Sequence, residues 1–172
     1  MTAKTGAHFP LERGFTLIEL VIVITIIGIL AAVALPRLID AQRDARVAKT
    51  NAIYGSMRSA AALARSRCEL DVAGTAPSAT VVNCASSPPK VNMDGTMVDM
   101  VNRYPAASAT GIEAAAAMTP AADGLTPGGG GSTRTFDVVG GTVPNCRVTY
   151  QEATLSGTAI VAPVISVATS GC

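Results

Sequence analysis

The chain has 172 residues, with 13 basic and 12 acidic side chains and a hydrophobic content of 49%. Its formal charge of +1 gives no support to nucleic acid as an obligatory partner. The length allows one domain of ordinary size beside a membrane segment. Hydrophobicity is unevenly distributed, and the longest apolar run lies near the N-terminus.

This apolar run extends from Phe15 to Leu35 and contains a single charged residue, Glu19. As a helix it would be roughly 31 Å long, which matches the hydrocarbon thickness of a bilayer. A carboxylate in such a segment costs several kcal/mol unless a cation pairs with it. We therefore interpret Glu19 as a functional residue, whose natural partner is a cation that appears when subunits assemble.

A short leader ending in Arg13 and Gly14 precedes the run, and residues 13–20 read Arg-Gly-Phe-Thr-Leu-Ile-Glu-Leu. This string resembles the processing and assembly signature of type IV pilins and pseudopilins. The resemblance implies that a prepilin peptidase in the inner membrane cuts between Gly14 and Phe15 and methylates the new amine of Phe15. Residues 1–14 would then be a leader peptide, and the precursor would cross the inner membrane once.

The spacing of Phe15 and Glu19 has a physical rationale of its own. After cleavage, the α-amine of Phe15 would be cationic near neutral pH. Glu19 lies four residues further on, about one helical turn away. The amine could pair with its own Glu19 or with Glu19 of a neighbouring subunit, and either ion pair would be costly to break inside an apolar bundle. We expect this pair to fix the register of subunits, as one buried polar group does in a coiled coil.

Two other interpretations of the apolar run remain open. A secretory signal peptide could end at the small residues 32–34, Ala-Val-Ala. A simple one-pass anchor would need only the length of the run. Neither explains Glu19, because this charge interrupts the apolar core of a signal peptide and an anchor has no use for it.

Pro36 follows the apolar run and is predicted to kink or loosen the helix where it leaves the membrane. From Arg37 to about Arg67, apolar residues recur at steps of three or four, which predicts an amphipathic second half of the helix. The predicted apolar stripe consists of Leu38, Ala41, Ala45, Ala48, Ala52 or Ile53, Met57, Ala60, and Leu63 or Ala64. The predicted polar face carries Arg37, Asp40, Arg43, Asp44, Lys49, Arg58 and Arg65. Asp40 and Asp44 could meet basic residues of a neighbouring subunit, or could simply be solvated.

From residue 68 onward, turn-forming residues dominate and we predict a globular head over residues 68–172, after an apolar helix at 15–36 and an amphipathic half at 37–67. The head is predicted to contain a short extended piece at Thr80–Val82, a short helix within Asp94–Asn102, a weak helix at Gly111–Met118 and a flexible loop at Pro127–Ser132. Three strands are predicted at Thr135–Val139, Arg147–Gln151 and Ile160–Val167. A long helix followed by late strands indicates an α+β fold, with the helix packed on an antiparallel sheet.

The four cysteines, Cys68, Cys84, Cys146 and Cys172, all follow the apolar run. An even number in an exported domain predicts two disulfides. Three connectivities are possible, and local pairing favours Cys68 with Cys84 and Cys146 with Cys172. A zinc site is disfavoured because no CxxC pair occurs and the only histidine, His8, lies in the leader.

The layout of the chain resembles the pilin fold, and several short strings resemble the mannose-sensitive haemagglutinin (MSHA) branch of pilins. These strings are Asp44-Ala45-Arg46 with Lys49, Arg103-Tyr104-Pro105-Ala106-Ala107 with Gly111-Ile112, and Cys146-Arg147-Val148-Thr149-Tyr150 with Gly171-Cys172. The resemblance implies that a C-terminal disulfide holds the last strands, in agreement with a pairing of Cys146 and Cys172.

Enzymatic activity is not expected. Once the leader is removed, the chain has no histidine for a Ser-His or Cys-His arrangement. The glycines at 128–131 lack the Lys-Ser/Thr that a phosphate-binding loop requires. Asp94-Gly95 and Asp123-Gly124 are weak calcium candidates that we interpret as turns, so no metal or cofactor is expected.

The sequence thus predicts a structural subunit that polymerises through its apolar helix into a helical homopolymer. The expected partners are other copies of the chain, a prepilin peptidase, the inner-membrane pilus assembly machinery and, for the precursor, the membrane. The expected final location is an extracellular pilus that serves adhesion or motility. A pseudopilin of a type II secretion system and a membrane-anchored binding module are the alternatives.

Overall fold

The computed structural model describes residues 14–74 and 84–172. The leader residues 1–13 and the predicted extended piece Thr80–Val82 lie outside the described residues. The chain forms two compact units, residues 1–41 and 42–172, and the helix α1 (Leu17–Val72) belongs to both. α1 continues beyond its predicted end at Arg67 and contains Pro36 in its interior, so the predicted kink at that proline stays a prediction.

The described part of the first unit is the apolar half of α1, and each of its residues from 14 to 41 is exposed. The apolar stretch of α1 carries a single charged residue, and none of it is buried. By length and composition, α1 is therefore able to cross a membrane.

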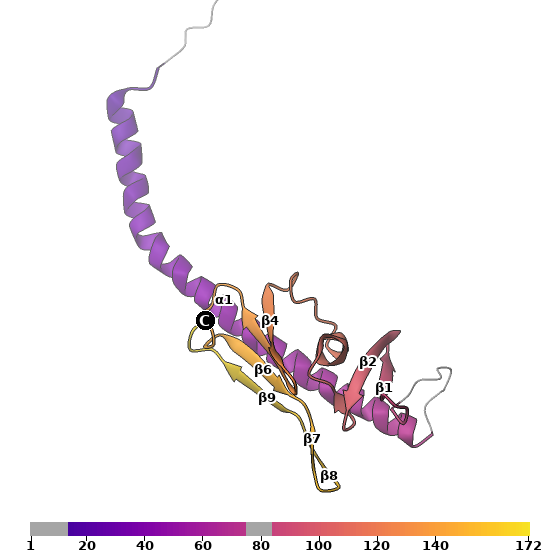
Figure 1. The fold of residues 1–172 in the computed structure, drawn as a ribbon. Helices are drawn as coiled ribbons and strands as arrows, with labels where there is room; N and C mark the ends of the chain where they lie inside the picture. Colours follow the sequence, from indigo (N-terminus) through magenta and orange to yellow (C-terminus); the bar gives the residue numbers. More distant parts are fainter. Residues whose placement is uncertain (1–13, 75–83) are drawn as a thin grey trace, which may run out of the picture. The chain divides into compact units, whose positions relative to one another are not determined.

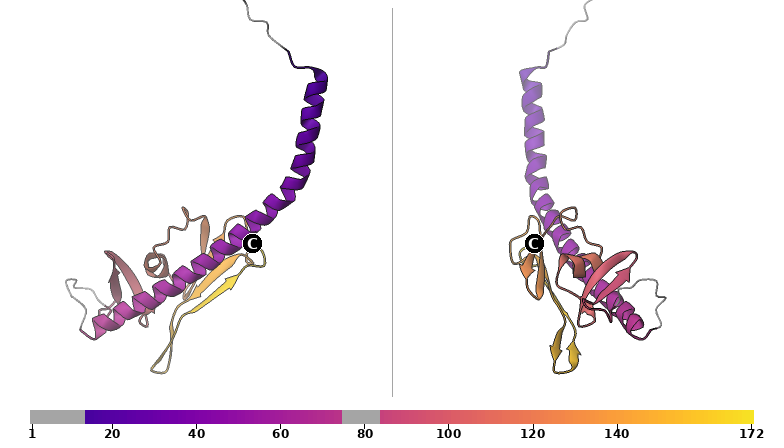
Figure 2. Two further views of the ribbon diagram at one scale, coloured as in Figure 1. Left: turned by 180° about the vertical axis from the view of Figure 1, so that it is seen from behind. Right: turned by 45° about the vertical axis from the view of Figure 1, so that its right-hand side comes forward.

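The second unit combines the remainder of α1 with antiparallel sheets (Figure 1). The smaller sheet has the order β1 (Lys90–Met93), β2 (Thr96–Val101), β3 (Tyr104–Pro105). The larger sheet has the order β4 (Leu125–Gly130), β5 (Thr133–Val138), β6 (Arg147–Gln151), β9 (Val164–Ala168). A separate hairpin is formed by β7 (Thr154–Ser156) and β8 (Ala159–Val161), and a π-helical turn, η1 (Ala109–Glu113), follows β3. The predicted α+β fold is confirmed, and both sheets lie along α1 in the two views of Figure 2.

The core forms where one stripe of α1 meets these sheets. The buried residues of α1 are Thr50, Met57, Ala60, Ala61, Ala64 and Cys68. Met57 and Ala61 pack with Phe136 and Tyr150 in the larger of two core clusters, beneath β5 and β6. The predicted stripe was wrong in part, because Ala45 and Ala48 are exposed and Thr50 is fully buried. Of the alternatives Leu63 and Ala64, Ala64 is the buried residue. Alanines occur all round this part of the helix, so their pattern does not define which face the sheet covers.

The predicted helix within Asp94–Asn102 was wrong, because these residues form the turn and second strand of the β1–β2 hairpin. Met93 pairs with Thr96, which leaves Asp94 and Gly95 as a two-residue turn. Both turn residues have positive φ, 48° and 86°. An Asp-Gly pair between apolar residues is a strong hairpin signal for this reason, and here it outweighs the helical spacing of the methionines and valines.

The predicted flexible loop at Pro127–Ser132 was also wrong. β4 includes Gly128, Gly129 and Gly130, which pair with Thr135, Arg134 and Thr133 of β5. A Cβ on Gly129 would lie 2.4 Å from the carbonyl oxygen of Thr133, and its φ is +88°. The glycine run therefore permits a close approach of β4 to β5, which is a tertiary requirement that composition alone does not reveal.

We expect Gly129→Ala to lower the free energy of unfolding by about 2 kcal/mol, because alanine must adopt an unfavourable φ and would contact the β5 backbone. The matched control is Gly130→Ala, since a Cβ on Gly130 would meet no atom within 4 Å and its φ is not positive. Chemical unfolding of the full chain in detergent, followed by tyrosine circular dichroism, measures both changes. Equal effects of the two substitutions would contradict this explanation of the glycine run.

The remaining strand predictions are largely confirmed. β6 has the predicted bounds and β5 is shifted by two residues at its start. The predicted strand Ile160–Val167 was wrong as one element, because it is divided into β8 and β9 around Ala162 and Pro163. Proline has no N–H to donate to a ladder, which explains the interruption. Within the predicted weak helix Gly111–Met118, helical structure covers η1 and the two alanines that follow it.

Tyr150 of β6 connects the larger sheet to the end of β3. Its side chain is fully buried, and its hydroxyl donates a hydrogen bond to the carbonyl oxygen of Pro105 at 2.7 Å. Burial raises the pKa of Tyr150 above the ordinary value of 10.0. The folded state therefore holds this proton more tightly than the unfolded state does.

We expect the stability of the head to fall as the pH rises above about 10, because the unfolded chain releases the Tyr150 proton while the folded chain retains it. Tyr150→Phe should make this alkaline decline shallower and should cost about 1 kcal/mol at neutral pH, where the hydrogen bond is lost. Unfolding midpoints measured from pH 7 to 11 provide the test. An unchanged alkaline slope in the variant would exclude Tyr150 as its source.

Candidate functional site

The candidate site begins at the junction between the predicted leader and α1. Gly14, Phe15 and Thr16 precede the first helical residue, Leu17. Phe15 is 85% exposed, and Gly14 is exposed as well. The peptide bond between Gly14 and Phe15 is thus in accessible chain outside the helix.

Glu19 is the acidic residue in the first turn of α1, and it forms a reciprocal pair with Thr16. The Thr16 hydroxyl oxygen accepts a hydrogen bond from the backbone N–H of Glu19 at 3.3 Å. In return, Glu19 Oε2 lies 3.4 Å from the Thr16 backbone nitrogen and 3.3 Å from the Thr16 hydroxyl, both of which donate to it. This arrangement is a capping box, which satisfies backbone N–H groups that a helix start leaves unpaired. The Thr-x-x-Glu spacing was visible in the sequence, but the capping role was not predicted.

The capping box leaves part of the Glu19 carboxylate available. Within residues 14–74 and 84–172, hydrogen bonds reach its Oε2, and Oε1 has no partner. The positive end of the helix dipole favours a carboxylate here and disfavours a cation. An α-amine created at Phe15 would face this same positive end, so it would need the Glu19 carboxylate more than an amine in solution does.

Behind Glu19, the surface of α1 is an uninterrupted apolar cylinder. The large exposed side chains of this segment include Leu17, Ile18, Leu20, Ile22, Ile24, Ile26, Ile27, Ile29, Leu30, Val33 and Leu35. The hydroxyl of Thr25 donates to the carbonyl oxygen of Ile22 at 2.8 Å, so it adds no unpaired polar group.

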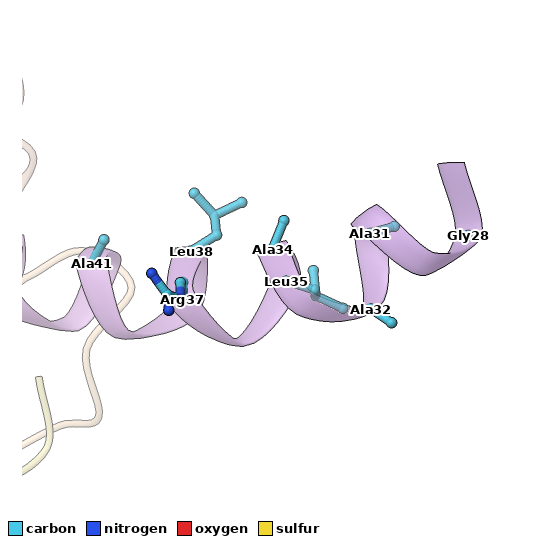
Figure 3. Close-up of a pocket in the computed structure, with 8 residues that line it drawn as sticks. All are labelled: Gly28, Ala31, Ala32, Ala34, Leu35, Arg37, Leu38 and Ala41. Carbon is cyan, nitrogen blue, oxygen red and sulfur yellow. The ribbon is translucent and has the colours of Figure 1, made fainter. Parts of the chain in front are cut away.

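Smaller side chains cover the helix surface towards the end of the apolar segment. Figure 3 shows the small residues Gly28, Ala31, Ala32 and Ala34 along the helix beside the larger Leu35 and Leu38, with the first cation, Arg37, between these two leucines in the chain. A continuous apolar surface of this extent is not found on a soluble monomer, and it requires lipid or other protein to cover it.

A second set of residues fixes the last strands to α1. The structure joins Cys68 to Cys84 and Cys146 to Cys172, and the predicted pairing of the latter two is confirmed. The buried hydroxyl of Thr50 lies 3.5 Å from the sulfur of Cys172 and 3.7 Å from that of Cys146. Arg46 of α1 donates a hydrogen bond to the carbonyl oxygen of Cys172. The roles of Arg46 and Thr50 were not predicted, because they depend on contacts across more than 120 residues.

The two calcium candidates, Asp94 and Asp123, do not belong to a metal-binding cluster in the part of the chain that the structure describes. No cluster of three or more His, Cys, Asp or Glu side chains occurs among those residues. Asp94 occupies the β1–β2 turn, and Asp123 accepts a hydrogen bond from the backbone N–H of Thr119 at 2.8 Å. Both calcium candidates are thus residues of turns.

Residues 10–35 match the family model described as the prokaryotic N-terminal methylation motif. Over 52 residues, the chain is 54% identical to the type IV narrow pilus major component PilA5 of Thermus thermophilus, covering 30% of this chain and 45% of that protein. It is 54% identical over 54 residues to the type IV major pilin protein PilA of Myxococcus xanthus, covering 29% and 24% of the two chains. The matches support the type IV pilin family.

A third relative, the type IV major pilin protein PilE1 of Neisseria gonorrhoeae, is 52% identical over 50 residues, covering 29% of this chain and 30% of that pilin. The chain thus matches less than half the length of these curated relatives. No solved structure matches it significantly. The similarity to pilins is therefore a property of under a third of the chain.

Proposed function

We propose that this chain is the precursor of a structural, non-enzymatic subunit of a type IV pilus. The single observation that carries the proposal is the exposed apolar half of α1 with one carboxylate, Glu19, in its first turn. A membrane can hold such a helix in the precursor, and other copies can cover it in a filament. The methylation-motif match and the pilin relatives support the same function.

Processing is the first step. A prepilin peptidase of the inner membrane removes residues 1–14 by cutting between Gly14 and Phe15, and it methylates the new amine of Phe15. The support is the accessible, non-helical chain at this bond and the family match that spans it. The membrane holds the apolar helix until assembly begins.

Polymerisation is the second step. The inner-membrane assembly machinery transfers the helix from lipid to a bundle of other copies, where apolar burial stabilises the filament by about 25 cal/mol per Å². The Phe15 amine pairs with Oε1 of a Glu19 carboxylate, which the capping box leaves without a partner in the described residues. This Glu19 belongs to the same chain or to a neighbouring copy. Because an unpaired charge in that bundle is costly, only registers that form the pair are stable.

More specifically, the proposed subunit belongs to the MSHA-like branch of pilins and forms an extracellular pilus that serves adhesion or motility. Its support is the set of short strings around Tyr104, Pro105 and the C-terminal cysteine pair. These strings form one connected region, because the Tyr150 hydroxyl donates to the carbonyl oxygen of Pro105 and Arg46 donates to that of Cys172. Agglutination of erythrocytes by sheared filaments, and its loss on addition of mannose, would test the MSHA-like assignment.

Cell fractionation tests the proposed function. The full chain is followed in cells with and without an active prepilin peptidase, and sheared surface material is examined by immunogold electron microscopy. We expect labelled filaments only when the peptidase is active. Retention of the chain in the inner membrane of both strains would instead identify an anchored binding module. Short periplasmic filaments would identify a secretion pseudopilin.

A further inference from the structure

A groove of about 340 Å³ lies in the second unit, between one face of α1 and the segment that joins β8 to β9. α1 contributes Arg58 and Arg65 to this groove, and the facing wall includes Tyr104, Pro163 and Ile165. No carboxylate lines it. The groove thus combines an apolar wall with two cations, which suits a carboxylate-bearing partner.

The two arginines differ in the partners that their positive charges have. The guanidinium of Arg65 lies 5.0 Å from the ring centre of Tyr104 and 3.7 Å from Glu69. Arg58 is exposed and has no hydrogen bond or ion pair with any residue in 14–74 or 84–172. Residues 75–83 contain no acidic side chain. Arg58 is therefore the groove's uncompensated charge.

The carboxylates of the second unit are nearly all engaged within the described part of the chain. Those that accept a hydrogen bond or an ion pair are Glu69, Asp71, Asp99, Glu113, Asp123, Asp137 and Glu152. Two remain, Asp44 and Asp94. Asp94 lines a small hollow together with Arg67, so a cation is nearby. Asp44 lies on an exposed face of α1 and forms no hydrogen bond or ion pair with residues 14–74 or 84–172.

Asp44 and Arg58 are related by the geometry of α1. They are separated by 14 residues, which corresponds to about 21 Å along the axis and about 40° around it. The two therefore lie on the same side of the helix. A second copy that lies parallel to the first, with this same side turned towards it and a displacement of about 21 Å along α1, would place its Asp44 opposite Arg58. Its exposed Ala45 and Ala48 beside Asp44 are small enough to allow close approach.

We propose that the groove at Arg58 binds a second copy of this chain, and that the ion pair between Arg58 and Asp44 of that copy sets the axial offset between the two. This inference rests on the proposed filament function and adds a second register contact to the pair at Phe15 and Glu19. Charge complementarity favours this occupant, because the groove's uncompensated cation, Arg58, and an exposed carboxylate without a partner in residues 14–74 and 84–172, Asp44, belong to the same chain.

A charge-swap experiment on the full chain, in cells that assemble it, tests the proposal. We expect Arg58→Asp and Asp44→Arg each to reduce the yield of sheared filaments at least about tenfold, because like charges then face each other. The double variant, Asp44→Arg with Arg58→Asp, should return the yield to within about twofold of wild type. Arg43→Asp is the matched control, since Arg43 is also exposed and unpaired in the described structure but does not line the groove.

The outcomes separate this inference from the function on which it rests. Wild-type yield from both single variants would overturn the ion pair. A double variant that yields no more filaments than the single variants would also overturn it. If Arg58→Asp reduces the filament yield and Asp44→Arg does not, the groove binds another anionic ligand and the ion pair is again overturned. In each of these cases the wild-type chain still forms filaments. Absence of wild-type filaments would overturn the proposed function as well.

Discussion

Replacement of Glu19 by alanine is expected to remove the chain from surface filaments by at least about 100-fold, while cleavage between Gly14 and Phe15 continues. The substitution leaves the Phe15 amine without a partner in an apolar bundle, at a cost of about 3–5 kcal/mol. The ratio of processed chain in sheared material to processed chain in the membrane fraction measures the effect.

Glu19→Gln is the matched variant that separates the two roles of this residue. Glutamine also forms capping boxes, so the hydrogen bonds with Thr16 can persist while the charge is lost. If charge pairing drives assembly, the glutamine variant should be lost from surface filaments almost as completely as the alanine variant. Normal filaments from Glu19→Gln, with loss only in Glu19→Ala, would show that the contribution of Glu19 is helix capping and would contradict the proposed ion pair.

Loss of the disulfide between Cys146 and Cys172 should produce the largest decrease in the stability of the head. The chain-entropy model gives about 3 kcal/mol for a loop with the observed separation of 26 residues. The double substitution Cys146→Ser and Cys172→Ser also exposes the main core cluster, to which both cysteines belong, and releases the contacts of Thr50. Tyrosine circular dichroism during unfolding reports on the head, because the chain has no tryptophan and Tyr54, Tyr104 and Tyr150 all lie in the second unit.

The second disulfide provides the control for this prediction. Cys68 and Cys84 are separated by 16 residues, so the entropic contribution of their bond is similar, again about 3 kcal/mol. Cys68 belongs to the smaller cluster beneath β1 and β2. We therefore expect the pair Cys68→Ser and Cys84→Ser to destabilise the head less than the C-terminal pair does. An equal or larger effect would show that the contacts of Thr50 and Arg46 add nothing to the C-terminal disulfide.

The N-terminal part of the molecule was largely predictable from the sequence. Length, apolar composition and the isolated Glu19 are local properties, and they are sufficient to predict an apolar helix that is long enough to cross a membrane and carries an acidic residue near its start. The capping box was equally local, since Thr16 and Glu19 have the required spacing. It was missed because Glu19 was interpreted through the Phe15 amine alone.

The head was predictable only where local chemistry determines structure. β6 shows the alternation of a half-buried strand, and it was predicted with its observed bounds. Gly128, Gly129 and Gly130 belong to strand β4 because they pair with β5. No local signal in the sequence indicates this pairing. The groove at Arg58 unites residues from α1, β3 and the β8–β9 connection, and their proximity follows only from the tertiary fold.

The most direct test of the central claim is the intact mass and N-terminal sequence of the chain recovered from sheared surface filaments. We expect a chain that begins at Phe15, carries one added methyl group on its amine and is four hydrogens lighter than its reduced form, two for each disulfide. A chain that begins at Leu35, after the small residues of a signal-peptidase site, would contradict it. So would absence of the chain from sheared material with the bond after Gly14 intact.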